Sequence, residues 1–379
     1  MADIYRLVNQ VKHYEWGSVE DIPAFLGIEN RENLPWAEMW MGTHSGAPSQ
    51  VRPENDGKLI NLADICGEPL PFLFKLLAAG KPLSIQAHPN LAQAAEGFNR
   101  EEKSGIALDD PKRNYKDPNH KPEILCAISP FTVMAGFREP AEIKKALEAF
   151  LTAAPPLGDA FSPLLLAIET GFLANFFRAL FGLTERERKN ICSFLLENET
   201  CKSIPQNLWK LMRDFAAQYP ADAAVLSPLY LNVFTLETGQ AVFVPAGVLH
   251  AYISGFGVEL MASSDNVLRG GLTPKHVDIG ELMKILDFNP FMPQIISPSS
   301  GNFRYPAPCR EFSLSLISGG GDKKVFPESG PAICIVSEGE IFAGSETFKK
   351  GESFFVPKTE NARLVFGGNY SLFSAGTVP

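Results

Sequence analysis

A short pattern occurs twice in this chain and restricts its fold more than any other feature. Residues 239–245 and, 112 residues later, residues 351–357 each contain a turn glycine, a run of β-forming apolar residues and a terminal proline. Such a repetition predicts two related β-units in one chain. Continued without a gap, the alignment pairs Ala362 with His250, so we expect the second unit to lack a site that depends on this histidine.

A helical block interrupts the β pattern. Pro140, with Glu139 and Glu142 beside it, predicts the start of a first helix. Pro163 predicts the start of a second, apolar helix that ends near Gly182. Further helical signals are the capping box of Thr184 with Glu187, the stretch 208–215 and the stretch 279–286.

The order of these patterns predicts a mainly β fold with a helical insertion. We expect a discontinuous first β-domain formed by residues 1–138 and 226–290, because strand-like runs separated by Pro, Gly, Asp and Asn occupy both stretches. Residues 139–225 would form the helical domain, and residues 291–379 the second β-domain.

Composition excludes several classes of partner. The chain has 379 residues, of which 45% are hydrophobic, and a net charge of −9, which argues against binding to nucleic acid or an anionic membrane. The longest apolar stretches, 72–79 and 163–183, contain Lys75, Glu169 and Arg178, so no membrane span is expected.

Cysteine spacing and the N-terminus suggest a compartment. The six cysteines form no CxxC pair, and no secretory signal is recognisable at the start of the sequence. We therefore expect reduced thiols and a cytoplasmic protein.

Two distant strand-like stretches each contain one histidine. In the first, Gln86 and His88 are two residues apart, so their side chains would share one face of a strand and could meet one metal ion. The second contains His250, and Tyr252 would lie on the same strand face. A second histidine and one carboxylate would complete four protein ligands, and the segment His120 to Glu123 lies between the two stretches.

A long polar segment precedes that carboxylate. Residues 99–121 contain almost nothing from which a strand or helix could be built. Loops of this length in compact domains are often functional, so a lid or substrate-lining role is one interpretation and a mobile surface excursion is the other.

Six motifs spread over most of the chain resemble those of the type I mannose-6-phosphate isomerases, zinc-dependent members of the cupin superfamily. The motifs are residues 14–18 (YEWGS), 37–44 (AEMWMGTH), 83–90 (LSIQAHPN), 114–123 (NYKDPNHKPE), 245–252 (PAGVLHAY) and 264–275 (SDNVLRGGLTPK). The chain departs from the pattern at Ser45, where many relatives have proline, and it is somewhat shorter than many of them.

The resemblance implies a fold, an activity and roles for individual residues. It implies two cupin-like β-barrel units beside the helical domain, the second a degenerate unit without a metal site. The implied ligands of a single Zn²⁺ are Gln86, His88, Glu123 and His250, and Arg269 is the implied catalytic arginine. The implied reaction interconverts mannose 6-phosphate and fructose 6-phosphate. We expect a small sugar phosphate as the partner, no nucleic acid or membrane partner, and a monomer or weak homodimer.

This chemistry agrees with the residues themselves. Isomerisation of an aldose to a ketose moves a proton between C2 and C1 through a cis-enediol. Two neutral histidines, an amide and one carboxylate would leave a Zn²⁺ site with a net charge of about +1, suited to polarising substrate oxygens. Arg269 would stabilise the developing enediolate, and the loss of one such donor typically costs roughly 3 kcal/mol.

The general base and the phosphate ligands are less sharply defined. Lys121 is the first candidate for the base, because a nearby metal cation disfavours the charged form of a lysine; His120 and Asp265 are rivals. Phosphate recognition is assigned to Lys75, Ser84 and Lys275. Asp265 and Tyr252 are also expected to line the substrate site.

Several of these residues also have a structural interpretation. Arg269 could be the salt-bridge partner of Asp265, and Lys75 could pair with a buried acid. Residues that lack neighbouring candidate ligands are expected to be structural, namely His13, His44, His276, Trp16 and Trp40.

Two other classes of function stay open. A cupin with two histidines and one carboxylate could hold Fe²⁺ and activate oxygen, although a fourth ligand, Gln86, would remove a position that oxygen chemistry needs. Alternatively, the chain could bind a sugar phosphate without turnover. The sequence does not fix the metal used in the cell.

Overall fold

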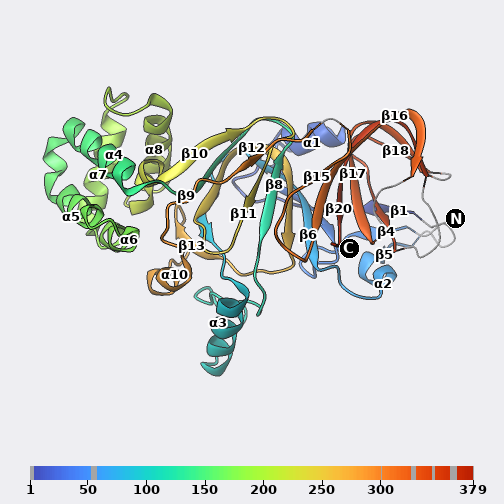
Figure 1. Ribbon diagram of the computed structural model, residues 1–379, viewed down its shortest axis with the longest axis horizontal. Coiled ribbons are helices and arrows are strands. Elements are labelled where there is room, and N and C mark those ends of the chain that lie inside the picture. Colours follow the sequence, from blue (N-terminus) through green and yellow to red (C-terminus); the bar gives the residue numbers. More distant parts are fainter. Residues whose placement is uncertain are drawn as a thin grey trace.

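Strands dominate the structure, a computed structural model that describes residues 4–52, 58–299, 301–325, 330–343, 346–358 and 365–378. They form two antiparallel sheets that lie next to each other, and a cluster of helices lies at the far end of the first sheet (Figure 1). The expected fold class, mainly β with a helical insertion, is confirmed. No helix within the described ranges is long and apolar enough to cross a bilayer.

The first sheet, as far as the chain is described, has eleven strands and carries the histidine stretches. Its strands are β2 (Gln10–Lys12), β3 (Glu38–Gly42), β6 (Phe72–Ala79), β7 (Ile85–Ala87), β8 (Glu123–Ala127), β9 (Phe131–Phe137), β10 (Leu231–Leu236), β11 (Ala241–Val244), β12 (His250–Ala262), β13 (Leu268–Gly271) and β14 (Ile295–Ile296).

The long strand β12 connects two halves of this sheet. Its first residues pair with β7 and β9, whereas the stretch from Gly255 onward pairs with β6 and β8. The ladder is irregular between Tyr252 and Ser254. Gly255 has a φ of +135°, and a Cβ at this position would lie 2.7 Å from the Cα of Phe131, so only glycine fits the bend. The bend brings strands from both halves around one interior.

Within the described residues, the second sheet has nine strands, of which three come from the first 61 residues and six from residues 303–376. Its strands are β1 (Tyr5–Val8), β4 (Gln50–Val51), β5 (Ile60–Asn61), β15 (Phe303–Tyr305), β16 (Ser313–Val325), β17 (Ala332–Ala343), β18 (Glu346–Lys349), β19 (Ser353–Val356) and β20 (Val365–Gly376). Because β1 pairs with β19, and β4 with β1, parts of the first 61 residues belong to this sheet. The domain boundaries expected from the sequence stay a prediction.

The repeated pattern forms the same turn in each sheet. Gly239 and Gly351 have φ values of +82° and +86°, and each precedes a strand, β11 or β19. The amide of Gln240 donates to the carbonyl of Glu237 at 2.8 Å, and the amide of Glu352 donates to Lys349 at 2.9 Å. In both turns the side chain of the later residue accepts a bond from the amide of the earlier one. The matched turns support related β-units; the position of Ala362 lies outside the described residues.

The helical insertion packs against the strands that carry the site. It consists of α4 (Pro140–Ala153), α5 (Gly158–Glu169), α6 (Leu173–Phe181), α7 (Glu185–Glu197) and α8 (Gln206–Gln218), with η1 (Pro155–Leu157), η2 (Ala223–Leu226) and α9 (Ser227–Tyr230). Its aromatic core is continuous with buried residues of β7, β9 and β13, so helices and strands share one apolar interior. The start of α4 at Pro140 and the capping box of α7 are confirmed.

Two expectations about helices were wrong. Pro163 lies inside α5 instead of opening a helix. The expected single helix is interrupted at residues 170–172, between α5 and α6. The helix α3 (Leu91–Lys103) was not expected, although Asn90 and Gln93 form a capping box at its start. Consequently only residues 104–121 of the polar segment lie outside a helix or strand. The remaining helices are α1 (Asp21–Leu26), α2 (Leu62–Cys66) and α10 (Ile279–Ile285).

Candidate metal centre and cleft

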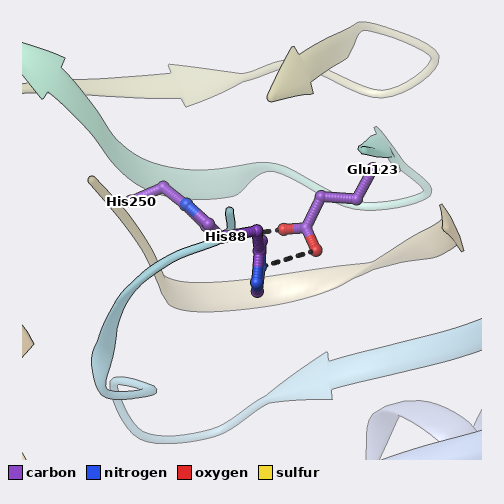
Figure 2. Close-up of side chains that lie close together, drawn as sticks. All are labelled: His88, Glu123 and His250. Atoms are coloured by element: carbon purple, nitrogen blue, oxygen red, sulfur yellow. Dashed lines mark ion pairs between the residues drawn. The ribbon is translucent and has the colours of Figure 1, made fainter. Parts of the chain in front are cut away.

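Three buried side chains from different strands converge in the first sheet. His88 follows β7, Glu123 begins β8 and His250 begins β12. Their side chains lie close together, and the carboxylate of Glu123 contacts both rings, at 2.9 Å from His250 Nε2 and 3.3 Å from His88 Nε2 (Figure 2). One ligand atom from each lies within 4.8 Å of the others, and all three residues are buried. This donor set, two imidazoles and a carboxylate, is one that binds Zn²⁺.

A tight turn holds the two histidine stretches together. Gly247, in the turn before His250, has a φ of +77°, and its amide donates to the carbonyl of His88 at 2.8 Å. Its own carbonyl accepts from the amide of Asp287 at 3.0 Å. A Cβ at Gly247 would lie 3.0 Å from the carbonyl oxygen of Ile285. The backbone therefore fixes the separation of the two rings.

Hydrogen bonds to carbonyl groups orient both rings. His88 Nδ1 lies 2.7 Å from the carbonyl oxygen of Asn266, and His250 Nδ1 lies 2.9 Å from that of Val248. Each Nδ1 must carry the proton to donate these bonds, which leaves the lone pair of a neutral ring on Nε2. Among the described residues, His88 Nε2 is buried without a hydrogen-bond partner. An orphaned acceptor that faces a carboxylate and a second imidazole fits a bound metal ion.

Electrostatics within the cluster favour an ionised carboxylate. Burial, followed by the charge of Lys121, lowers the pKa of His88 to about 4. Burial opposes the charge of His250, but the carboxylate of Glu123, 2.9 Å from its Nε2, outweighs this and raises its pKa. Burial likewise opposes ionisation of Glu123, yet His250 and His88 hold its pKa well below the ordinary value. Tyr252 donates to Glu123 Oε1 at 2.8 Å.

The loop before Glu123 is tied to the ring of His88 through one residue. Asn266 is fully buried, and its side-chain oxygen accepts from the amide of Lys116 at 2.7 Å. Its side-chain amide donates to the carbonyls of Asp117 and Asn119, both at 2.8 Å. Because the carbonyl of Asn266 also holds His88, the anchored part of this loop supports the metal-binding cluster.

Gln86 lies between two other residues of the predicted site. In the sheet it is the direct cross-strand neighbour of His250 in β12 and of Arg269 in β13. Opposite residues in neighbouring strands have side chains about 5 Å apart. Gln86 donates to Ser84 Oγ at 3.4 Å. It lines a small cavity of about 60 Å³ together with Glu123 and His250.

A cleft of about 760 Å³ adjoins this small cavity. Both are lined by Glu38, Leu83, Ser84 and Gln86. The cleft also contains Arg269 and Lys275 from the β13 region, and His13, Tyr14 and Trp16 from the N-terminal segment. The structure therefore brings the predicted arginine and two of the predicted phosphate ligands to one concave surface. Trp16, expected to be core, is half-buried and contributes to the cleft wall.

Arg269 has no ion pair with Asp265. Asp265 instead lies 3.3 Å from His44 Nε2, and this contact lowers the pKa of the carboxyl group. Burial lowers the pKa of Arg269. The pKa of Lys275 is lowered first by burial and then by the charge of Arg269. No carboxylate in the described part of the chain pairs with either cation, so both are available to an anion in the cleft.

Lys75 lies deeper and is already paired. Its ammonium group is 2.8 Å from Glu259 Oε2 and 3.3 Å from Glu38 Oε1, and all three side chains are buried. Burial opposes its charge, but the two carboxylates outweigh this and raise its pKa. The interpretation of Lys75 as the partner of a buried acid agrees with this geometry.

The candidates for the general base lie in different surroundings. Lys121 is buried, lines the small cavity and has its ammonium group 3.9 Å from Glu123 Oε2. The ring of His120 turns toward the second sheet, where Nε2 lies 2.7 Å from Glu311. Asp265 is held by His44, as described above. Of the three, only Lys121 lines the small cavity.

Sequence reasoning missed two carboxylates of this cavity, Glu38 and Glu259. Each is the only acidic residue in a strand, β3 or β12, whose other residues are mostly apolar. Burying an acid without a partner is energetically unfavourable. A lone charged residue in an apolar strand is the pattern that drew attention to Lys75, and Glu38 and Glu259 show the same pattern.

Comparisons with known proteins agree with this site. The family model for the catalytic domain of type I phosphomannose isomerase matches residues 4–140. Mannose-6-phosphate isomerase of Escherichia coli (strain K12) is 35% identical over 387 residues, which cover 96% of this chain and 97% of the relative. Mannose-6-phosphate isomerase 2 of Arabidopsis thaliana is 33% identical and covers 94% of this chain and 89% of its own length.

Solved structures extend the similarity to the whole fold. A variant of phosphomannose isomerase from Salmonella typhimurium superposes with a TM-score of 0.90 at 32% identity, over 100% of both chains. A zinc-bound mannose 6-phosphate isomerase superposes with a TM-score of 0.88 at 33% identity, also over 100% of both chains. Sequence relatives along nearly the full length, the shared fold and the buried His/Glu/His group lead to one conclusion: this chain belongs to the type I phosphomannose isomerase family.

Proposed function

We propose that this protein is a zinc-dependent isomerase that interconverts mannose 6-phosphate and fructose 6-phosphate. The observation that carries the proposal is the convergence of His88, Glu123 and His250 next to a cleft that contains two cations, Arg269 and Lys275, with no carboxylate partner among the described residues. A metal site beside an anion-binding surface suits a substrate with a reactive carbonyl at one end and a phosphate at the other.

The metal would be held by His88, Glu123 and His250, with Gln86 as the fourth ligand. Bound Zn²⁺ supplies a Lewis acid that polarises the oxygens on C1 and C2 of the sugar. The residues of the chain prepare this site by fixing the proton of each imidazole on Nδ1 and by keeping Glu123 ionised. Tyr252, which donates to Glu123, keeps that carboxylate in one orientation.

Arg269 is proposed to stabilise the enediolate. Its guanidinium group has no carboxylate partner in the described part of the chain, and it lines the same cleft as Gln86. A fixed, partly desolvated donor stabilises developing negative charge more strongly than water does. Ser84 and Lys275 are proposed to hold the phosphate at the cleft. A contribution of Lys75 to phosphate binding stays a prediction, because two carboxylates already neutralise its charge.

Lys121 is proposed as the general base, ahead of His120 and Asp265. It would remove the proton from C2 of the aldose and return it to C1 on the same face of the cis-enediol, with the sugar oxygens held by the groups named above. Its position in the small cavity supports this role, since its two rivals bond to Glu311 and His44.

Assembly and compartment are proposed from the sequence. We propose a monomer or weak homodimer in the cytoplasm with a small sugar phosphate as partner. The cysteine spacing and the net charge of −9 support this. The division into domains 1–138 with 226–290, 139–225 and 291–379 is also a proposal, supported by the helical stretch between the two parts of the first sheet.

A coupled assay of mannose 6-phosphate to fructose 6-phosphate tests the function. Metal-free protein should be inactive, and added zinc should restore turnover. The zinc-loaded variants His250→Ala and Arg269→Ala should each lose at least about 100-fold in kcat/KM. The exposed His276 and Arg186 provide matched controls, and alanine there should leave turnover unchanged. Turnover in metal-free protein, or consumption of O₂ with iron in place of isomerisation, would overturn the proposal.

A further inference from the structure

One wall of the cleft is a short loop with a cavity on each side. We call residues 271–275, which follow β13, the cleft loop. Thr273 and Pro274 line the 760 Å³ cleft and also a second cavity of about 470 Å³ on the side of the helical insertion. Gln218 and Tyr219, at the end of α8, line both cavities as well. A wall with space behind it cannot be held by close packing alone, so its position depends on specific bonds.

A single carboxylate of the helical insertion supplies these bonds. Asp222 lies between α8 and η2, and its Oδ2 accepts from the amide of Leu272 at 2.7 Å. The backbone of Thr273 also bonds to this carboxylate. Its Oδ1 accepts from the amide of Ala224 at 2.8 Å and so caps η2. The carboxylate therefore joins the insertion to the cleft loop through charge-assisted hydrogen bonds, which are stronger than neutral ones.

The backbone at this junction is strained without such a partner. Leu272 has a φ of +53°, a left-handed conformation that is unfavourable for a non-glycine residue. Gly271 has a φ of +121°, and a Cβ there would collide with the Cβ of Ala224. Residues held in sparsely populated conformations persist only where the surroundings determine them. Here the determining group is the side chain of Asp222, which is bonded on both sides of the junction.

We propose that Asp222 is a positioning residue that holds the cleft loop and thereby sets the affinity for the sugar phosphate. This inference rests on the proposed isomerase function. Asp222 does not line the cleft itself and touches neither Arg269 nor the metal-binding cluster; it acts through the backbone of Leu272 and Thr273. The helical insertion is then part of substrate recognition, because it places the loop on which Lys275 lies.

The zinc-loaded variant Asp222→Asn tests the inference. Asparagine keeps the shape of the side chain, but its amide group can accept bonds only through one oxygen, so it cannot satisfy both Leu272 and Ala224. We expect KM for mannose 6-phosphate to rise about tenfold while kcat changes by less than about threefold, since the loop contributes to binding more than to proton transfer. Hydrogen exchange at the amides of Leu272 and Thr273 should accelerate by at least about tenfold, and zinc content should stay unchanged.

Asp278→Asn is the matched control. Asp278 caps α10 by accepting from the amide of Glu281 at 2.9 Å, but it does not line the cleft. This variant should lose a comparable cap without a change in KM or in exchange at the cleft loop.

The possible outcomes separate the two proposals. Slow exchange at the amide of Leu272 in a wild-type protein that does not isomerise mannose 6-phosphate would overturn the proposed function. It would still support the view that Asp222 holds the cleft loop. An active wild type whose Asp222→Asn variant keeps its KM would overturn the role in affinity, whether or not exchange accelerates. Equal KM increases in the variants of Asp222 and Asp278 would show a general effect of lost stability and would also overturn the inference. Asp222→Ala, if it folds, should show a larger rise in KM than Asp222→Asn.

Discussion

Replacing Lys75 by methionine tests how much the buried charges in the first sheet contribute to the free energy of unfolding. The ammonium group lies 2.8 Å from Glu259 and 3.3 Å from Glu38, and none of the three side chains has appreciable exposure. At an effective dielectric constant of about 20, these distances correspond to roughly 6 and 5 kcal/mol of direct attraction. Much of this attraction only offsets desolvation, and removal of one partner of a buried cluster typically costs about 3–5 kcal/mol.

The loss should depend on pH. Burial raises the pKa of Glu259, and Lys75 opposes this, so the variant should raise it further. The folded variant then binds a proton more tightly than the unfolded chain, in which the pKa of Glu is about 4.3. Stability of the variant therefore rises as the pH falls through the folded pKa, and is lowest at alkaline pH.

Urea unfolding of metal-free protein, followed by fluorescence, measures both effects. At pH 8 the free energy of unfolding should fall by about 3–5 kcal/mol in Lys75→Met, and the deficit should shrink toward pH 5. Adding Glu259→Gln should restore at least about 1.5 kcal/mol at pH 8, because one of the two stranded charges is gone. The exposed Lys202 is the control, and Lys202→Met should change stability by less than about 0.5 kcal/mol.

Two results would refute the reasoning. A deficit below about 1 kcal/mol at pH 8 would mean that the two acids do not need the cation. A full deficit that is the same at pH 5 and pH 8 would mean that lost packing, not stranded charge, is responsible. If Lys75 also binds the phosphate of the substrate, KM should rise in Lys75→Met/Glu259→Gln even where its stability is restored.

Three further predictions concern the metal centre. Tyr252→Phe removes the hydrogen bond to Glu123 and should weaken zinc binding about 10- to 100-fold in a chelator competition, with little change in fold. Gly247→Ala combines a φ of +77° with a Cβ 3.0 Å from the carbonyl of Ile285; it should lower stability by about 1–3 kcal/mol and weaken zinc binding, as measured by thermal unfolding and the same competition. Zinc affinity should fall as the pH decreases through the raised pKa of His250, because the metal competes with the proton; isothermal titration across pH 5.5–8 checks this, and a pH-independent affinity would contradict it.

Local patterns in the sequence were sufficient where a few neighbouring residues decide the structure. The turn glycines at 239 and 351 predicted two matched β-turns, and Thr184 with Glu187 predicted a helix start, because backbone freedom and capping act over a few residues. The helix at 91–103 was also predictable from local sequence, because Asn90 and Gln93 form a capping box at its start, but this pattern was overlooked. Pro163 misled because a proline can also lie inside a helix, where it removes one backbone hydrogen bond but need not end the helix when packing supports it.

The sequence by itself indicated which side chains could form a metal centre. The QxH spacing, the acid after the long loop and the second histidine are types and intervals that a metal centre requires, and they are readable without coordinates. Only the tertiary structure decided their partners. The carboxylates that pair with Lys75, the carbonyls that orient the two imidazoles and the aspartate that holds the cleft loop all lie far away along the chain. Electrostatic and hydrogen-bond energies depend on distance in space, and folding sets these distances through the packing of the whole chain, so no short stretch of sequence contains them.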